Sequence, residues 1–302
     1  MAHLGITLYT PATHPDLGAI AAGKFPGLTN HVWCTEDAIR DEELSEAMQN
    51  ILRHLDYAES FTSRVYLRVR SPDVLTELAR HDLSRVHGFI LPKIHDGNLR
   101  AYMDVLPATH VAQLTLETRE ALSEHRMMVL RDLIFQESWQ GYVEALRIGG
   151  NDLMNVLGVR RAPGRTVYEG PLERIVSMLV GVFRPYGFQL SSPVYEVFSD
   201  LITLAREVQQ DLEYGLSGKT IIHPVQLATV RQGYRVPVRD LEEAQAILKP
   251  DAPAVFQMNG RMCEPATHRR WAHDTAERAT LYGLLPPSAG DALHYLPALG
   301  AI

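Results

Sequence analysis

Polar and charged side chains recur in this sequence where short apolar runs end. They are Thr10, Glu36, Asp37, Arg68, Arg70, Lys93, Glu117, Asp152, Ser192 and His223. If these runs are parallel strands, their carboxyl ends meet at one edge of the sheet, and the side chains there share one site. Carboxylates and cations at such an edge predict a site that binds an anionic substrate through a metal ion.

Glu117 and Asp152 are the candidate metal ligands. Hard divalent cations such as Mg²⁺ prefer oxygen ligands, and they often take one or two carboxylates while keeping water molecules that a substrate can displace. The alternative is that each carboxylate caps a helix or pairs with a neighbouring cation. The pattern alone leaves both interpretations open.

Arg68 and Lys93 are the cations with the clearest chemical use. The guanidinium of Arg68 suits a carboxylate or a developing enolate, although a salt bridge with Glu36 would also account for it. Lys93 has the side chain for a Schiff base with a carbonyl substrate, but we favour a structural ion pair.

The segment from Gly218 to His223 invites two further hypotheses, and we favour neither. A phosphate-binding loop needs a glycine five residues before Gly218, where this chain has Glu213, and it should open a helix rather than precede a strand. His223 stands before a proline, and a packed, hydrogen-bonded histidine is the commoner outcome than a general base.

Eight strand-like runs alternate with helical patterns, and their starts are about 31 residues apart. The runs are 5–10, 31–36, 64–70, 88–93, 112–117, 145–150, 188–192 and 220–223. Alternation of this kind predicts right-handed βαβ units and a parallel sheet, and eight units favour closure into a (β/α)8 TIM barrel. An open doubly wound sheet is the alternative. We expect the barrel to span 1–235 and a C-terminal helical extension to span 236–302, at a subunit interface.

The composition excludes several classes of protein. The 302 residues are 46% hydrophobic and 22% charged, with a net charge of −7, and this balance argues against nucleic-acid binding. Two distant cysteines, Cys34 and Cys263, do not indicate a disulfide framework. The sequence shows no secretory signal and no apolar run of membrane-spanning length. We therefore expect a cytoplasmic protein with no membrane partner.

Seven short motifs in order resemble the citrate lyase β-subunit branch of the aldolase/citrate lyase (HpcH/HpaI) family over about residues 5–265. They are Leu8-Tyr-Thr-Pro11, Glu36-Asp37-Ala38, Leu67-Arg68-Val69, Leu91-Pro92-Lys93, Glu117-Thr118, Gly149-Gly-Asn-Asp152-Leu153 and Gly218-Lys219-Thr-Ile-Ile-His223-Pro224.

This resemblance implies a magnesium-dependent carbon–carbon lyase, with Mn²⁺ as an alternative ion, that acts on a keto or hydroxy acid or an acyl thioester such as a coenzyme A ester. It implies that Glu117 and Asp152 bind the metal and that Arg68 contacts the substrate and its enolate. It also implies a homotrimer or hexamer in which a neighbouring subunit supplies an acid, and Glu264 is the candidate. Thr10 and Glu36 are further candidates for substrate binding.

The departures from the family pattern concern the substrate. Gly5 and His14 stand near the places of two family arginines, and Cys34 replaces an aspartate. Arg70 replaces an asparagine, so we expect it to bind an additional anionic group, from a phosphorylated substrate or a dicarboxylate. Two rival functions stay open: phosphoryl transfer to or from an enolpyruvate, and a non-catalytic barrel that binds metal or ligand.

Overall fold

The structure, a computed structural model of the whole chain, describes residues 3–285. It divides into two compact units, Leu4–Val230 and a second unit formed by Met1–His3 with Arg231–Ile302. Each unit is described here by itself. Residues 286–302 of the expected C-terminal extension lie outside the described part.

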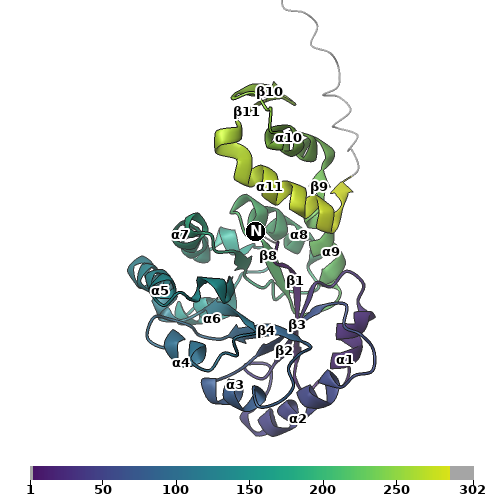
Figure 1. Cartoon of the computed structure of the whole chain (residues 1–302), viewed down its shortest axis with the longest axis vertical. Helices are drawn as coiled ribbons and strands as arrows, with labels where there is room; N and C mark the ends of the chain where they lie inside the picture. The colour runs from purple at the N-terminus through teal and green to yellow at the C-terminus, as the bar shows by residue number, and fades with distance from the viewer. Residues whose placement is uncertain (1–2, 286–302) are drawn as a thin grey trace, which may run out of the picture. The chain divides into compact units, whose positions relative to one another are not determined.

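The larger unit is a closed barrel of eight parallel strands in sequential order, with β8 pairing back to β1 (Figure 1). The strands are β1 (Gly5–Pro11), β2 (Asn30–Cys34), β3 (Arg64–Arg68), β4 (Val86–Leu91), β5 (Val111–Leu116), β6 (Val143–Ile148), β7 (Leu190–Ser192) and β8 (Gly218–Ile221). The expected (β/α)8 TIM barrel is confirmed, and all eight predicted runs overlap a strand.

Helices follow the strands along the chain. They are α1 (Leu17–Ala19), α2 (Leu44–Leu55), α3 (Pro72–Leu78), α4 (Leu99–Met103), α5 (Glu124–Gln136), α6 (Gly150–Val156), α7 (Leu172–Phe183), α8 (Leu201–Glu213) and α9 (Gln226–Gly233). Shorter helical turns are η1 (Ile20–Lys24), η2 (Asp41–Glu43), η3 (Arg119–Leu122), η4 (Trp139–Gly141), η5 (Val167–Glu169) and η6 (Arg184–Tyr186).

Local sequence signals explain where these helices begin and which face they bury. Ser71 caps α3, its hydroxyl accepting a hydrogen bond from the Val74 amide at 3.3 Å, and Pro72 occupies the first turn, where its missing N–H costs nothing. In α2, Ala47, Ile51 and Leu55 are buried at four-residue spacing, so one stripe of the helix faces the strands.

The main apolar core lies between the strands and their helices. Leu67, Phe89, Leu114 and Leu146 from β3 to β6 belong to the same buried cluster as Ile51, Leu75, Leu130 and Leu179 from the helices. A smaller cluster of Val32, Tyr66 and Ile90, with Tyr9 packed against it, comes from β1 to β4.

A hydrogen-bonded polar chain links β3, β5, β6 and β8. Glu144 on β6 accepts hydrogen bonds from the Tyr66 hydroxyl at 2.7 Å and from Gln113 Nε2 at 2.8 Å. Gln113 Oε1 in turn accepts a hydrogen bond from Arg147 at 2.7 Å. The amide of Gln113 therefore bridges two charged side chains: it donates to the carboxylate of Glu144 and accepts from the guanidinium of Arg147.

Strand β8 is fastened to α8 by a buried ion cluster. The ammonium of Lys219 is fully buried, 2.7 Å from Glu207 and 2.9 Å from Asp211, and both carboxylates belong to α8. Arg161 also pairs with Glu207. The lysine of the Gly218-Lys219 motif is thus a packing residue.

In its described part, up to residue 285, the second unit contains the helices α10 and α11 and two small sheets. Its elements are β9 (Val236–Pro237), α10 (Val238–Leu248), β10 (Phe256–Met258), β11 (Arg261–Cys263), α11 (Pro265–Tyr282) and β12 (Leu284–Leu285). Asn259 and Gly260 both have positive φ, at 51° and 76°, as a tight turn between β10 and β11 requires. Ala244, Ile247, Cys263 and Ala272 form its described core.

Candidate active site at the carboxyl ends of the strands

A cavity of about 510 Å³ lies at the carboxyl ends of the barrel strands. Barrels of this kind place their active sites at this edge. The charged and polar side chains that line it include Tyr9, Cys34, Asp37, Arg68, Thr115, Glu117, Arg147, Asn151, Asp152, Asn155 and Thr220.

Arg68, at the end of β3, is the centre of an ion cluster. One of its terminal nitrogens is 2.7 Å from Glu36, 3.3 Å from Asp37 and 3.0 Å from Glu117. Its Nε is buried and has no hydrogen-bond partner in the described protein. A buried donor without an acceptor is costly, so this edge of the guanidinium is suited to an oxygen atom from a ligand. The salt bridge with Glu36 that we weighed as an alternative is present as well.

Glu117 and Asp152 converge in the cavity. Glu117 follows β5, and its side chain is almost fully buried. Asp152 lies in the first turn of α6 and shares a hydrogen bond with Glu117. Burial raises the pKa of Glu117 to about 7, with a contribution from Asp152 and against the opposing effect of Arg68. The pKa of Asp152 is also raised, first by burial and then by Asp37.

The charges of this cluster do not balance, which fits a bound divalent cation. Four carboxylates and three cations lie in or beside the cavity, so one negative charge is in excess when every carboxylate is ionised; the carboxylates are those of Glu36, Asp37, Glu117 and Asp152, and the cations are Arg68, Lys93 and Arg147. Within residues 3–285, no group of three or more His, Cys, Asp or Glu side chains is placed to hold a metal. Two carboxylates with water and substrate would be the ligand set, as Mg²⁺ commonly has.

Lys93 acts through both its backbone and its side chain. Its φ of 53° is unusual for a residue with a side chain, and in this conformation its amide donates a 2.9 Å hydrogen bond to Glu117. Its ammonium pairs with Glu36 and Asp37. Burial alone would lower the pKa of Lys93, but the hydrogen bonds to these carboxylates raise it. A protonated amine does not form a Schiff base, which supports the ion-pair interpretation.

Three of the expected substrate-binding residues, Thr10, Glu36 and Arg70, lie outside the cavity lining. The hydroxyl of Thr10 is buried and bonds to Nε2 of His31 at 3.0 Å, and it is the neighbouring Tyr9 that lines the cavity. Arg70 donates to Thr35 O at 2.8 Å and to Asp41 at 2.5 Å. The guanidinium of Arg70 therefore holds the segment that follows β2, and this position does not support the expected role as an additional anion-binding cation.

The remaining candidates have defined neighbours. Glu36 does not line the cavity but pairs with two of the residues that form the site, Arg68 and Lys93. Glu264 belongs to the second unit, where it precedes α11 and its amide donates to His268 Nδ1 at 3.1 Å. His223 is exposed and therefore not the packed histidine that we expected, although Phe198 stacks on its ring at a centroid distance of 4.8 Å and its Nδ1 accepts a hydrogen bond from the Val225 amide at 3.2 Å.

The sequence pattern missed Tyr9, Arg147, Thr115 and Thr220 as lining residues. Arg147 had a usable signal, because an arginine inside an otherwise apolar strand needs a reason to be buried. Cys34 stands where the family has an aspartate. Burial raises the pKa of its thiol, so the side chain facing the cavity is a neutral thiol.

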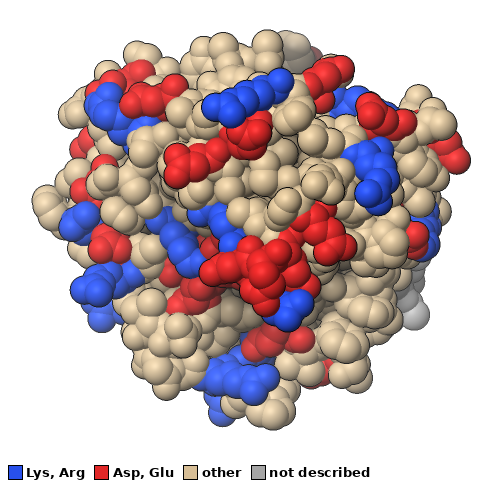
Figure 2. Space-filling model, turned by 90° about the horizontal axis from the view of Figure 1, so that it is seen from below, with Lys and Arg blue, Asp and Glu red and all other residues tan. Residues whose placement is uncertain are grey.

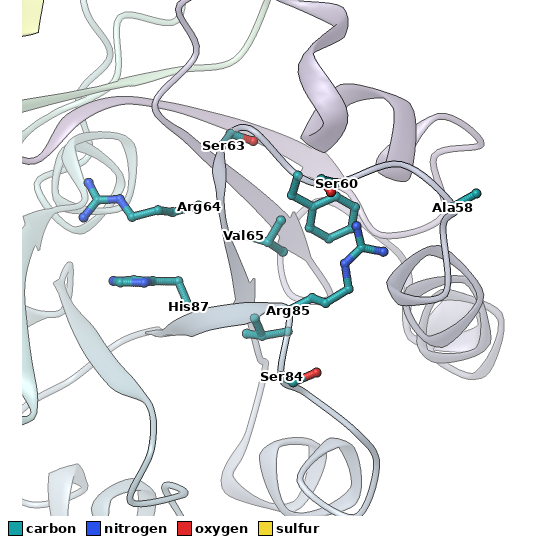
Figure 3. A pocket seen from close by; sticks show the side chains of 10 residues that line it. Ala58, Ser60, Ser63, Arg64, Val65, Ser84, Arg85 and His87 are labelled. Atoms are coloured by element: carbon teal, nitrogen blue, oxygen red, sulfur yellow. The ribbon is translucent and has the colours of Figure 1, made fainter.

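A second cavity, of about 540 Å³, lies near the start of β3 and β4 (Figure 3). Arg64 and His87 point the same way in it, whereas Arg85 points away from them. Arg64 pairs with Glu144 at 3.3 Å, and Arg85 donates to the carbonyl oxygens of Leu55, Tyr57 and Glu59. Because both guanidiniums are already engaged, this cavity is a weaker candidate for an anionic substrate.

The charge distribution and the helices bear on possible partners. On the face shown in Figure 2, Lys and Arg side chains lie among Asp and Glu side chains and do not form a continuous basic area. None of the helices within residues 3–285 has both the length and the apolar character that crossing a membrane requires.

Comparison with known proteins places this barrel in a family. The curated relatives include a (3S)-malyl-CoA thioesterase of Cereibacter sphaeroides, 27% identical over 235 residues, which cover 75% of this chain and 70% of that protein. A citrate lyase of Burkholderia xenovorans has a TM-score of 0.73 at 19% identity, covering 97% of this chain and 96% of that one.

CitE of Mycobacterium tuberculosis, crystallised with magnesium, acetoacetate and coenzyme A, has a TM-score of 0.67 at 20% identity and covers 91% of this chain and 98% of that one. At these identities the two solved structures support the fold alone. A family model described as a C–C bond lyase of the TIM-barrel fold matches residues 1–284. The resemblance seen in the ordered motifs is confirmed: the chain belongs to this C–C bond lyase family.

Proposed function

We propose that this protein is a magnesium-dependent carbon–carbon lyase that cleaves, or in reverse joins, a keto or hydroxy acid or its acyl thioester. The observation that carries the proposal is the convergence of Glu117 and Asp152 beside Arg68 in one cavity. The family match and the magnesium complex of the M. tuberculosis protein support it.

Glu117 and Asp152 would hold the cation, for which Mn²⁺ is the alternative. When bound, the ion would supply a Lewis acid and a template for the oxygens of the substrate. Because the pKa of Glu117 is raised to about 7, its carboxyl is only partly ionised at neutral pH when no cation is bound. Binding of the cation therefore displaces the proton that remains.

Arg68 would stabilise the negative charge that develops during cleavage. When the carbon–carbon bond breaks, its electron pair moves into an enolate. The hydroxyl proton of the other fragment passes to a water molecule in the cavity, and that fragment leaves as a carbonyl compound. Arg68 is held in place by Glu36 and Glu117, and its unpartnered Nε can donate to the enolate oxygen. Donors fixed in advance at the point of charge development commonly contribute the largest catalytic effect.

The enolate carbon must then receive a proton, and we propose Glu264 of a neighbouring subunit as the donor. The support is its place in the Gly260–Glu264 segment, which resembles the family element that carries this acid. We propose a homotrimer or hexamer accordingly. Glu264→Gln should then lower turnover while leaving magnesium binding intact, and sedimentation of the full chain should show a trimer or hexamer.

The deciding experiment follows products from a panel of keto acids, hydroxy acids and hydroxyacyl thioesters that includes (3S)-malyl-CoA. Cleavage of that compound yields glyoxylate and acetyl-CoA, whereas hydrolysis, the activity in the name of the C. sphaeroides relative, yields malate and free coenzyme A. We expect cleavage products that depend on Mg²⁺ and are lost in Glu117→Gln. Chelator-resistant turnover, release of free coenzyme A alone, or no turnover across the panel would contradict the proposal.

A further inference from the structure

Arg147 is a buried cation that forms no ion pair with any carboxylate in the described part of the chain. It lies on β6, lines the cavity and is 3% exposed. Its terminal nitrogens donate to Gln113 Oε1 at 2.7 Å and to Thr220 Oγ1 at 2.5 Å, and both acceptors are neutral. Among the described residues, no carboxylate forms an ion pair with it.

Other buried arginines of the barrel unit differ from Arg147 in this respect. Arg68 contacts three carboxylates, Arg161 pairs with Glu196 and Glu207, and Arg131 pairs with Asp132. Burying a guanidinium without a counterion is unfavourable, because the lost hydration is not replaced. The Tyr9 ring, 5.4 Å from the guanidinium carbon, offers a cation–π contact but no negative charge.

The position of Arg147 relative to Arg68 indicates what could neutralise it. The guanidinium carbon of Arg68 lies 5.8 Å from the centre of the same Tyr9 ring. Both cations also line the one cavity. A small molecule in this cavity would therefore lie next to both guanidiniums, one at the ion cluster and one with no counterion.

We infer that Arg147 binds a second anionic group of the substrate, a carboxylate or a phosphate, and so selects dianionic substrates over monocarboxylates. The inference rests on the proposed function, since it places the first anionic group at Arg68 and the carboxylate pair. It also reassigns to Arg147 the role expected of Arg70, whose guanidinium, unlike that of Arg147, is paired with a carboxylate, that of Asp41. A guanidinium binds a carboxylate and a phosphate in the same way, because either anion offers two oxygens to two parallel N–H groups of the guanidinium.

Three 2-hydroxy acids that differ at one carbon test this inference. Lactate carries hydrogen at C3, malate carries a carboxylate there, and 3-phosphoglycerate carries a phosphate ester. Calorimetric titration of the full chain with each compound, using both enantiomers and with or without MgCl₂, gives the dissociation constants. We expect at least one dianion to bind about tenfold or more tightly than lactate, as a charge-assisted contact allows. The malate and phosphoglycerate arms distinguish the two kinds of anion.

The variants separate recognition by Arg147 from a purely structural role. Arg147→Gln should bring the preferred dianion to within about twofold of lactate, and Arg147→Lys should retain part of the preference because it keeps the charge. Arg131→Gln removes another buried arginine that is distant from this chemistry, so it is the matched control and should keep the full preference. Thermal unfolding of each variant checks that it is folded.

Failure of this inference is distinguishable from failure of the proposed function. If neither dianion binds more tightly than lactate, or if the preference survives in Arg147→Gln, the inference is overturned. If Mg²⁺ changes no affinity but the dianion preference disappears in Arg147→Gln, the inference stands and the magnesium-dependent function does not.

Discussion

Glu117 occupies the space that a side chain at Gly149 would need. A Cβ atom on residue 149 would lie 2.4 Å from Cβ and 2.5 Å from Oε2 of Glu117, closer than such atoms approach in proteins. The glycine between β6 and α6 thus lets the backbone pass against the carboxylate. The Gly-x-x-Asp spacing sets Asp152 three residues later, on the first turn of α6, so one short segment positions both carboxylates.

Gly149→Ala should therefore displace the Glu117 carboxylate. We expect a loss of stability of about 1–3 kcal/mol from overpacking, together with weaker magnesium binding. Urea unfolding and calorimetric titration with MgCl₂ measure the two effects. Gly141→Ala is the matched control, because a Cβ there would meet nothing within 4 Å. If Gly149→Ala bound magnesium as tightly as the wild type, the position of Glu117 would not limit magnesium binding, and the prediction would be wrong.

Asp152→Asn should remove stabilisation by magnesium without unfolding the protein. In the wild type, magnesium at one hundred times its dissociation constant stabilises the folded state by about 2.7 kcal/mol. In the variant we expect little of this gain, and the metal-free protein should be as stable as the wild type or more so, since two repelling carboxylates become one. Thermal unfolding with and without MgCl₂ measures this, and the exposed Glu59→Gln should behave as wild type. A normal magnesium shift in Asp152→Asn would exclude this residue as a ligand.

Glu117 predicts a distinct pH dependence. Its folded pKa, about 7, is above the ordinary value of 4.5, so the folded state binds this proton more tightly than the unfolded state does. Without metal, the contribution of this group to stability is therefore present below about pH 4.5 and is lost as the pH rises through 7. Magnesium affinity should rise over the same interval, because the metal competes with the proton. Unfolding curves from pH 4.5 to 8, compared with those of Glu117→Gln, isolate the effect. If Glu117→Gln showed the same dependence of stability on pH as the wild type, Glu117 would not be the group that titrates near pH 7.

Glu144 predicts the opposite dependence at acid pH. Burial would raise its pKa, but hydrogen bonds from His87, Gln113 and Tyr66 lower it to about 2. Its stabilisation is therefore present above the ordinary value of 4.5 and is lost as the pH falls toward 2. Glu144→Gln should cost about 1–3 kcal/mol, because it removes the negative charge that accepts hydrogen bonds from Tyr66, Gln113 and Arg64. The variant should also no longer lose stability as the pH falls from 4.5 toward 2. Acid titrations followed by circular dichroism test this, and an unchanged acid midpoint in the variant would refute it.

The sequence predicted the barrel well because the signals for it are local. Each βα unit carries its own apolar run and helix periodicity, so β2 and α2 are recognisable without knowledge of the rest of the chain. Family motifs then identified Arg68, Glu117 and Asp152, which the structure brings together. Their chemical roles remain predictions.

The sequence could not show which face of a strand points into the barrel. Strands of a parallel barrel are buried on both faces and lack the alternation that would reveal it. Tyr9 lines the cavity whereas Thr10, the residue singled out from the sequence, contacts His31. Arg70 shows a related limit, since a cation after a strand can turn back to nearby carbonyl oxygens instead of facing the site. Arg147 was overlooked because its missing counterion is visible only in three dimensions.

The buried ammonium of Lys219 makes closure of the barrel depend on α8. Both carboxylates that neutralise it belong to that helix, and the lysine stands opposite Ile6 of β1 where the first and last strands pair. Without Glu207 and Asp211, a buried cation with no counterion would lie at this junction, which is strongly unfavourable. We therefore expect damage to α8 to be felt where the barrel closes and not only in the helix itself.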